Sequence, residues 1–165
     1  MKTILSPSDH SETLDFSPPE SRPSLQVRTI LVPTDLEERH MKTVWLAAQL
    51  AANWGAELKL LHVYHNPAPT SHTRPMHGTY LCEEYRSAKV SALQELCRQV
   101  NESYPHCQAY FAEGYPPDEI GQYAKHLHAD LLILSQNLRL PAVLGLSETP
   151  AIIREAGIPA LILPN

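Results

Sequence analysis

Short apolar runs alternate with amphipathic stretches from residue 27 onward, and this alternation constrains the fold more than any other feature. Continuous apolar runs are typical of strands buried on both faces, and apolar residues at three- and four-residue steps are typical of helices. Such alternation predicts a doubly wound α/β fold, with a parallel sheet covered by helices on both faces. The expected strands lie at 30–32, 58–63, 106–114, 130–135 and 158–165, and the expected helices at 36–55, 80–100, 115–129 and 150–157.

Several residues predict where these elements begin and end. Gly55 is expected to close the first helix, because glycine readily adopts the left-handed conformation of a helix C-terminus. Pro117 suits the first turn of the third helix, where no backbone donor is needed. Thr149 predicts an N-cap for the last helix, just before Pro150. The third strand is less apolar than the others, so we expect it at a sheet edge.

Composition argues against several classes of partner. The net charge of −5 opposes binding to nucleic acid and to anionic membranes. No apolar run is long enough to span a membrane. The three cysteines, Cys82, Cys97 and Cys107, form no CxxC pair, which favours a reduced, cytoplasmic protein in which they are inert small hydrophobes.

The first 26 residues differ from the rest of the chain. They are rich in Ser and Pro and contain no long apolar stretch. Such a segment buries too little apolar surface to offset the entropy of ordering. We therefore expect a flexible N-terminal tail over 1–26 and a single domain over 27–165.

Ligands of open parallel sheets bind beyond the carboxyl ends of the strands, at the point where the strand order reverses. In this chain the first and fourth strands end at Thr34 and Asp35 and at 135–137. Asp35 has two compatible interpretations: it caps the helix that follows, or it contacts a ligand. Four histidines at 62, 65, 72 and 77 could bind zinc, but their spacing fits no strong motif, and a solvated loop over 65–78 is the simpler interpretation.

The ordered segments also resemble a known family. "ILVPTD", "GAELKLLHV", "EGYPPDEIGQYAKHLHADLLILS" and "REAGIPALILP" are similar, in this order, to the strands and helices of single-domain universal stress proteins. The resemblance covers nearly everything after the tail. It implies a five-stranded parallel sheet in the order 3-2-1-4-5, of the Rossmann-like type also found in adenine nucleotide alpha hydrolases. It also implies a stress-response binding module rather than an enzyme, with slow ATP hydrolysis left open.

The resemblance assigns roles to particular residues. Asp35 matches the acid that approaches adenine and ribose, and Val63 matches the strand residue whose backbone reads the adenine edge. Pro33 and Thr34, just before Asp35, are also expected to bind the nucleotide. The ligand implied is ATP or another adenine nucleotide, and Mg²⁺ could accompany it. Phosphate contacts are expected from the loop after the fourth strand and the helix that follows, through Ser135, Asn137, Arg139, Gly145, Ser147 and Thr149.

That loop departs from the family's ATP signature, G-x2-G-x9-G-[ST]. Ser135 and Leu138 stand where the first two glycines belong, Gly145 lies one place early, and the loop is about two residues short. Glycines there let backbone N–H groups approach phosphate, and Leu138 fills that space. Two hypotheses follow: side chains replace the glycines and a nucleotide binds, or the protein acts without a nucleotide, with Leu138 and Leu144 filling the site.

The resemblance further implies a homodimer. Universal stress proteins commonly pair through their last strand, and an apolar edge strand seeks a partner. The expected contacts are Leu161, Ile162 and Leu163, with a further, unidentified protein partner. A third hypothesis is a nucleotide hydrolase or nucleotidyl transferase. It is the weakest, because "PTDLEERH" offers acids where a phosphate loop needs glycines or basic residues.

Overall fold

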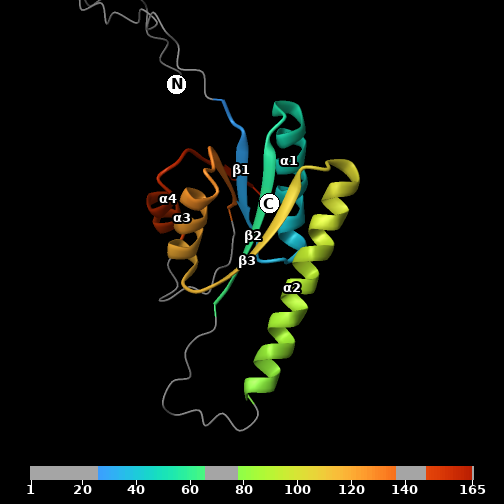
Figure 1. The fold of residues 1–165 in the computed structure, drawn as a ribbon. Helices are drawn as coiled ribbons and strands as arrows, with labels where there is room; N and C mark the ends of the chain where they lie inside the picture. The colour runs from blue at the N-terminus through green and yellow to red at the C-terminus, as the bar shows by residue number, and fades with distance from the viewer. Residues whose placement is uncertain (1–25, 66–77, 137–147, 165) are drawn as a thin grey trace, which may run out of the picture.

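The computed structural model describes residues 26–65, 78–136 and 148–164 (Figure 1). These residues form one five-stranded parallel sheet in the order β3-β2-β1-β4-β5. The predicted fold class and strand order are therefore confirmed. The elements, in chain order, are β1 (Thr29–Pro33), α1 (Glu38–Trp54), β2 (Glu57–Tyr64), α2 (Gly78–Ser103), β3 (Cys107–Glu113), α3 (Pro116–His126), β4 (Leu131–Ser135), α4 (Thr149–Ala156) and β5 (Ala160–Leu163).

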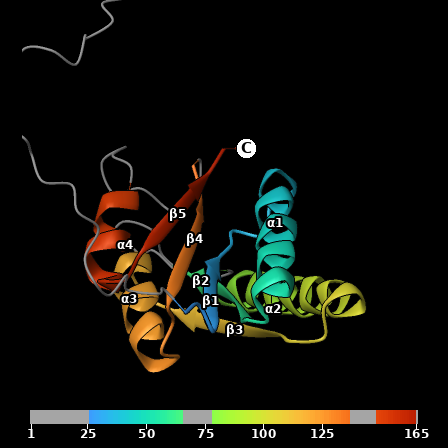
Figure 2. The same cartoon turned by 90° about the horizontal axis from the view of Figure 1, so that it is seen from above.

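Helices cover both faces of the sheet, as Figure 2 shows from above. On one face, α1 and α2 pack on a buried cluster that includes Ile30, Leu60 and Ile133. On the other face, α3 and α4 pack on a second cluster that includes Leu61 and Leu132. Successive strand residues thus alternate between two cores, which is why these strands are apolar throughout instead of alternating with polar residues.

The predicted capping residues are partly right. Gly55 closes α1 at φ 65°, and its N–H donates to the Ala51 carbonyl, as expected for a left-handed C-cap. A proline begins α3, in agreement with the prediction, although the first residue is Pro116. The prediction for α4 was wrong, because its N-cap is Glu148 and Thr149 is already helical. The third strand lies at a sheet edge, as predicted.

The second helix is longer than its apolar periodicity predicts. It spans Gly78–Ser103, so Gly78 belongs to the helix and not to the preceding loop. The sequence favours a shorter helix because the apolar stripe begins only near residue 81, and a helix can extend past its packed face where solvent satisfies its backbone ends. Residues 1–25 of the predicted tail and most of the histidine loop lie outside the described residues.

Candidate functional site

The carboxyl ends of β1 and β4 meet at one edge of the sheet. Strand β1 pairs with β4 in the register Ile30↔Leu131 and Leu31↔Leu132. Continuing that register places Ser135 level with Thr34, just before Asp35. All three side chains are buried. The structure therefore brings together the strand ends at which the sequence predicts a ligand, and it places buried polar groups there.

Asp35 organises the loop between β1 and α1. Its Oδ1 accepts a hydrogen bond of 2.9 Å from the backbone N–H of Glu37. Thr34 Oγ1 accepts a similar bond of 3.1 Å from the Leu36 N–H. The interpretation of Asp35 as the N-cap of α1 was wrong, because Glu37 occupies that position and Asp35 instead closes a turn two residues before it.

The same loop contains an unusual backbone conformation. Leu36 lies at φ 64°, in the left-handed region that non-glycine residues rarely enter. Strained residues of this kind persist only where their surroundings determine the conformation, and they concentrate at functional sites. Here the Thr34 and Asp35 side chains accept hydrogen bonds from the N–H groups of Leu36 and Glu37 and so hold the backbone in this conformation.

His40 is a site residue that the sequence analysis missed. It lies in the first turn of α1, and its Nδ1 donates to Asp35 Oδ1 over 2.5 Å. The His40 side chain is only 2% exposed and that of Asp35 10%. Asp35 precedes α1, and His40 lies inside it, so no helical periodicity relates the two residues. The sequence therefore gives no signal for this pair.

His62 supports the loop from the second strand. Its Nδ1 donates to the Thr34 carbonyl oxygen over 2.8 Å, which requires the proton to be on Nδ1. Burial lowers the pKa of His62, since the charged ring would be desolvated, and the nearby Lys89 acts in the same direction. The hydrogen bond to Thr34 and the charge of Asp35 oppose this shift but are smaller effects.

A lysine from α2 also reaches this edge. Lys89 Nζ lies 3.4 Å from the Asp35 carbonyl oxygen and 3.8 Å from Glu37 Oε1. It is therefore a fixed positive charge beside the β1–α1 loop. No sequence pattern points to Lys89, because α2 is far from Asp35 along the chain and only the packing of α2 against the sheet brings them together.

Val63 presents its backbone beyond the end of β1. The last residue of β1, Pro33, pairs with Leu61, and the Leu61 carbonyl accepts from the Thr34 N–H. Residues two apart in a strand direct their backbone groups to the same side. The N–H and C=O of Val63 therefore point to the β1 side, past the last paired residue of β1.

The zinc hypothesis for the histidines gains no support in the described part of the chain. His62 donates to Thr34, and His65 Nδ1 donates to the Gly114 carbonyl oxygen over 3.1 Å. Within residues 26–65, 78–136 and 148–164, no group of three or more His, Cys, Asp or Glu side chains is placed to hold a metal ion. His72 and His77 lie outside these ranges.

Part of the predicted phosphate site also lies outside the described residues. Asn137, Arg139, Gly145 and Ser147 are in this group, together with Leu138 and Leu144. Thr149 is described, as the first residue of α4. Because α4 connects the end of β4 to the start of β5, its N-terminus is reached directly from the loop after Ser135.

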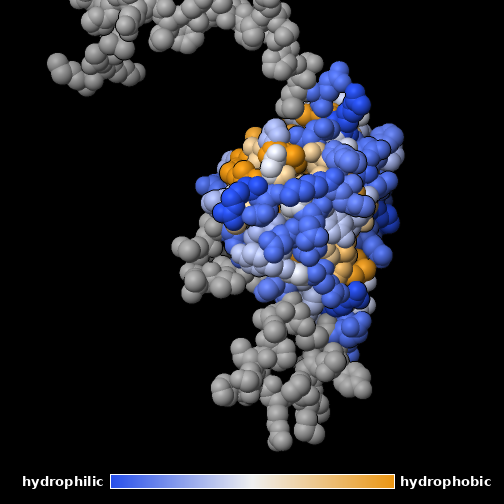
Figure 3. Space-filling view, turned by 60° about the vertical axis from the view of Figure 1, so that its left-hand side comes forward, coloured by the Kyte–Doolittle hydropathy of each residue, from blue (hydrophilic) through white to orange (hydrophobic). Residues whose placement is uncertain are grey.

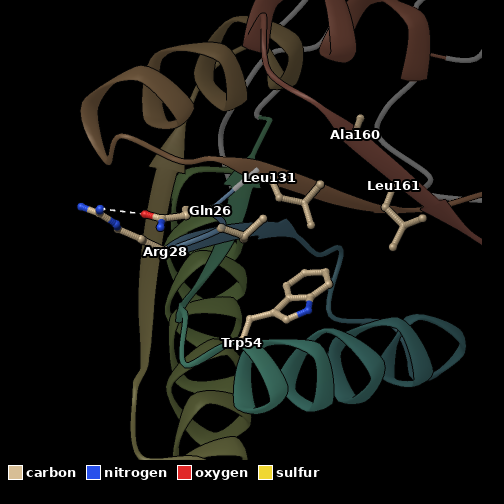
Figure 4. A pocket seen from close by; sticks show the side chains of 7 residues that line it. Gln26, Arg28, Trp54, Leu131, Ala160 and Leu161 are labelled. Carbon is tan, nitrogen blue, oxygen red and sulfur yellow. Dashed lines mark hydrogen bonds between the residues drawn. The ribbon is translucent and has the colours of Figure 1, made fainter. Parts of the chain in front are cut away.

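A groove of about 750 Å³ lies at the amino ends of the strands, away from the Asp35 loop (Figure 4). Leu131 and Ala160, which begin β4 and β5, lie along it, and the indole of Trp54 at the end of α1 faces them. Gln26, Val27, Arg28 and Leu161 complete its lining. This groove is mainly apolar and belongs to the amino ends of the strands, so it is separate from the Asp35 edge.

Two further observations bear on location and thiol chemistry. No helix in the described residues is long and apolar enough to cross a membrane. Cys97 and Cys107 are both buried free thiols, and burial together with the neighbouring Cys97 raises the pKa of Cys107. A raised pKa leaves little thiolate, the reactive form, which agrees with the prediction for Cys107, whereas the Cys82 side chain lies outside the described part of the chain.

The chain was compared with known proteins. The model of the universal stress protein family matches residues 26–164. No curated protein matches the chain. Universal stress protein UspA from Lactobacillus plantarum has a similar structure, with a TM-score of 0.68, 21% identity, and coverage of 84% of this chain and 98% of that one.

Two other similar structures contain nucleotides. One is a universal stress protein in complex with cAMP, with a TM-score of 0.63, 20% identity, and coverage of 84% of this chain and 98% of that one. The other is the universal stress protein from Archaeoglobus fulgidus in complex with dAMP, with a TM-score of 0.60, 17% identity, and coverage of 83% and 98%. At these identities the structures show the shared fold, and the family model, which covers most of the chain, shows the membership. The chain belongs to the universal stress protein family.

Proposed function

We propose that this protein is a binding module that takes an adenine nucleotide at the carboxyl edge of β1 and β4. The observation that carries the proposal is the Asp35 loop, in which a buried carboxylate is fixed at the point where strand order reverses. Two structures of similar fold were determined with cAMP and dAMP, which supports the same ligand class here.

The described residues divide into two ends of the site. Asp35, with Pro33 and Thr34, takes the ribose and adenine end, and the Val63 backbone, which points past β1, reads the adenine edge. Ser135 and the start of α4 at Thr149 serve the phosphate end, where helix N–H groups attract anions. Asn137, Arg139, Gly145 and Ser147 complete this end in the proposal, and Mg²⁺ enters bound to the phosphates.

Within this proposal, nucleotide binding is expected to act as a regulatory switch. We assign no catalytic residue, so any ATP hydrolysis is expected to be slow. The buried free thiols support a cytoplasmic location within this proposal. We also keep the division into a tail over 1–26 and a domain over 27–165 as a prediction.

The test is a calorimetric titration of the full chain with ATP and with AMP, with and without Mg²⁺. We expect binding, and we expect Asp35→Ala to weaken it about 10- to 100-fold, as loss of a charge-assisted hydrogen bond does. Asp118→Ala, which removes an exposed carboxylate on α3, is the matched control and should bind as the wild type does. Far-UV circular dichroism checks that each variant is folded.

The opposite result is equally informative. If millimolar nucleotide releases no heat and does not raise the melting temperature, the nucleotide site is lost and the protein acts through protein contacts alone. That second candidate is favoured by one observation: Leu161 and Ile162, on the edge strand β5, are 37% and 44% exposed. In the space-filling view, hydrophobic surface gathers near the upper end of the molecule and in a second area lower on the right, and polar residues cover most of the rest of that face (Figure 3).

We further propose that β5 forms a two-fold contact with β5 of a second copy. Leu161 and Ile162 would supply the apolar contact. Leu163 is half-buried against the core on the α1 side, so its part in the contact is smaller than the sequence suggests. This dimer is compatible with either candidate function, because it uses the outer edge of the sheet and not the Asp35 loop.

A further inference from the structure

We propose that His40 is a positioning residue for the nucleotide site: its buried imidazole sets the direction in which the Asp35 carboxylate faces a ligand. This inference rests on the proposed nucleotide site. It goes beyond that site in assigning a role to a residue that contacts no nucleotide itself.

The hydrogen bonds at Asp35 carry the argument. Oδ1 accepts from both the Glu37 N–H, at 2.9 Å, and His40 Nδ1, at 2.5 Å. Rotation of the carboxylate about its bond to Cβ moves Oδ1 away from its donors. Two donors on that oxygen oppose this rotation more strongly than one does, and so hold the plane of the group and the direction of Oδ2.

Burial separates the role of His40 from that of Asp35. The His40 side chain is 2% exposed, so a ligand cannot reach it, whereas the Asp35 side chain retains 10% exposure at the strand end. The hydrogen bond to Asp35 Oδ1 therefore gives His40 an indirect route to the ligand. This is the geometry of an orienting partner, in which one group holds another that contacts the ligand.

The surrounding loop shows why such support is needed. Leu36 holds a strained left-handed conformation directly after Asp35. His62 anchors the residue before it through the Thr34 carbonyl, and Lys89 lies near the Asp35 carbonyl. These contacts hold the backbone of the loop, whereas the His40 side chain bonds to the carboxylate itself, as the Glu37 N–H also does.

The experiment is a double-mutant cycle with AMP as the probe, because AMP presents the ribose and adenine end that Asp35 is proposed to contact. Wild type, His40→Leu, Asp35→Ala and the double variant are titrated by calorimetry. We expect His40→Leu to weaken binding about 10-fold, the loss typical of one hydrogen bond to a charged group. In the Asp35→Ala background, His40→Leu should cause no further loss, because its effect passes through the carboxylate.

A conservative variant distinguishes positioning from loss of packing. His40→Asn retains a donor near the position of Nδ1, so it should keep AMP affinity within about three-fold of the wild type. The asparagine side chain is smaller than leucine and packs less well, so retained affinity cannot come from packing. Independent effects of the two substitutions in the cycle, or unchanged affinity in folded His40→Leu, would overturn the inference while leaving the proposed function intact.

A ligand-free measurement keeps the two proposals distinguishable. In a ¹⁵N-labelled wild-type protein, the His40 Nδ1 proton should give a strongly deshielded signal that Asp35→Ala abolishes. If the wild type lacks that signal, or if it survives in Asp35→Ala, the orienting contact is absent and the inference fails. If the signal behaves as expected but AMP does not bind, the proposed function fails and His40 supports only the loop, which also overturns its positioning role.

Discussion

Among single residues, His62 is expected to make the stability of the fold depend on pH. Its pKa is lowered in the folded chain, chiefly by burial, whereas in the unfolded chain it returns to about 6.5. Between these values the unfolded chain binds the extra proton, so stability is complete above about pH 6.5 and falls as the pH drops toward the folded pKa. We predict that His62→Asn, which keeps a donor to Thr34 but cannot titrate, flattens this fall.

The measurement is the free energy of unfolding in urea at pH 7.5 and at pH 5. The chain has nine histidines, so the comparison is between variants. His126→Asn, at an exposed position on α3, is the control and should keep the wild-type slope. A His62→Asn protein that loses as much stability on acidification as the wild type would show that the ring is protonated when folded.

Residue by residue, the sequence predicts the Asp35 edge better than its supporting contacts. A polar residue after a buried strand reveals Asp35, and the fourth strand reveals Ser135 in the same way. His40 gives no comparable signal, because its bond to Asp35 depends on the left-handed Leu36 between them. Leucine rarely adopts the left-handed conformation, so the sequence does not predict it for Leu36.

At the scale of elements, the contact between α3 and α4 offers a sharp test. Gly121 lies where the two helices approach, and a Cβ added there would be 2.9 Å from both Cβ and the carbonyl oxygen of Glu155. The backbone of α4 cannot move aside as a flexible side chain could. The overpacking, about 1–3 kcal/mol, should exceed the gain in helix propensity, about 1 kcal/mol, so Gly121→Ala is predicted to destabilise the fold by about 1 kcal/mol.

Urea denaturation measures this loss, and Gln122→Ala is the matched control. Gln122 follows Gly121 on α3 but is exposed, so its replacement should leave stability within about 0.5 kcal/mol of the wild type. A glycine-to-alanine change at an open helical position stabilises a protein. If Gly121→Ala did the same, the close contact with α4 would be wrong.

The elements themselves follow closely from the sequence, for a physical reason. The strands are buried on both faces, so they are continuously apolar, and glycine or proline marks helix ends such as those of α1 and α3. Two errors, the start of α2 at Gly78 and the cap of α4 at Glu148, lie beside segments without an apolar pattern, where packing gives no periodic signal. A third, Asp35 as the cap of α1, arose because Asp35 closes a turn two residues before the true cap at Glu37.

For the whole molecule, the exposed edge of β5 leads to a prediction about assembly. A two-fold contact uses the same patch on both copies, so one substitution alters it twice. We predict that the wild type has twice the chain mass of 18.5 kDa in solution, and that Ile162→Glu, which buries two carboxylates in the apolar contact, yields monomers. Light scattering coupled to size exclusion measures both masses.

A charge on an unrelated apolar surface separates this effect from general destabilisation. Tyr85 is 54% exposed on α2, which packs over β2 and β3 on the far side of the sheet from β5, so Tyr85→Glu should remain dimeric. A monomeric wild type at tens of micromolar would contradict the edge contact. A monomeric Ile162→Glu protein that still binds AMP would show that the β5 contact and the Asp35 loop act independently, since none of the hydrogen bonds described above for that loop comes from β5.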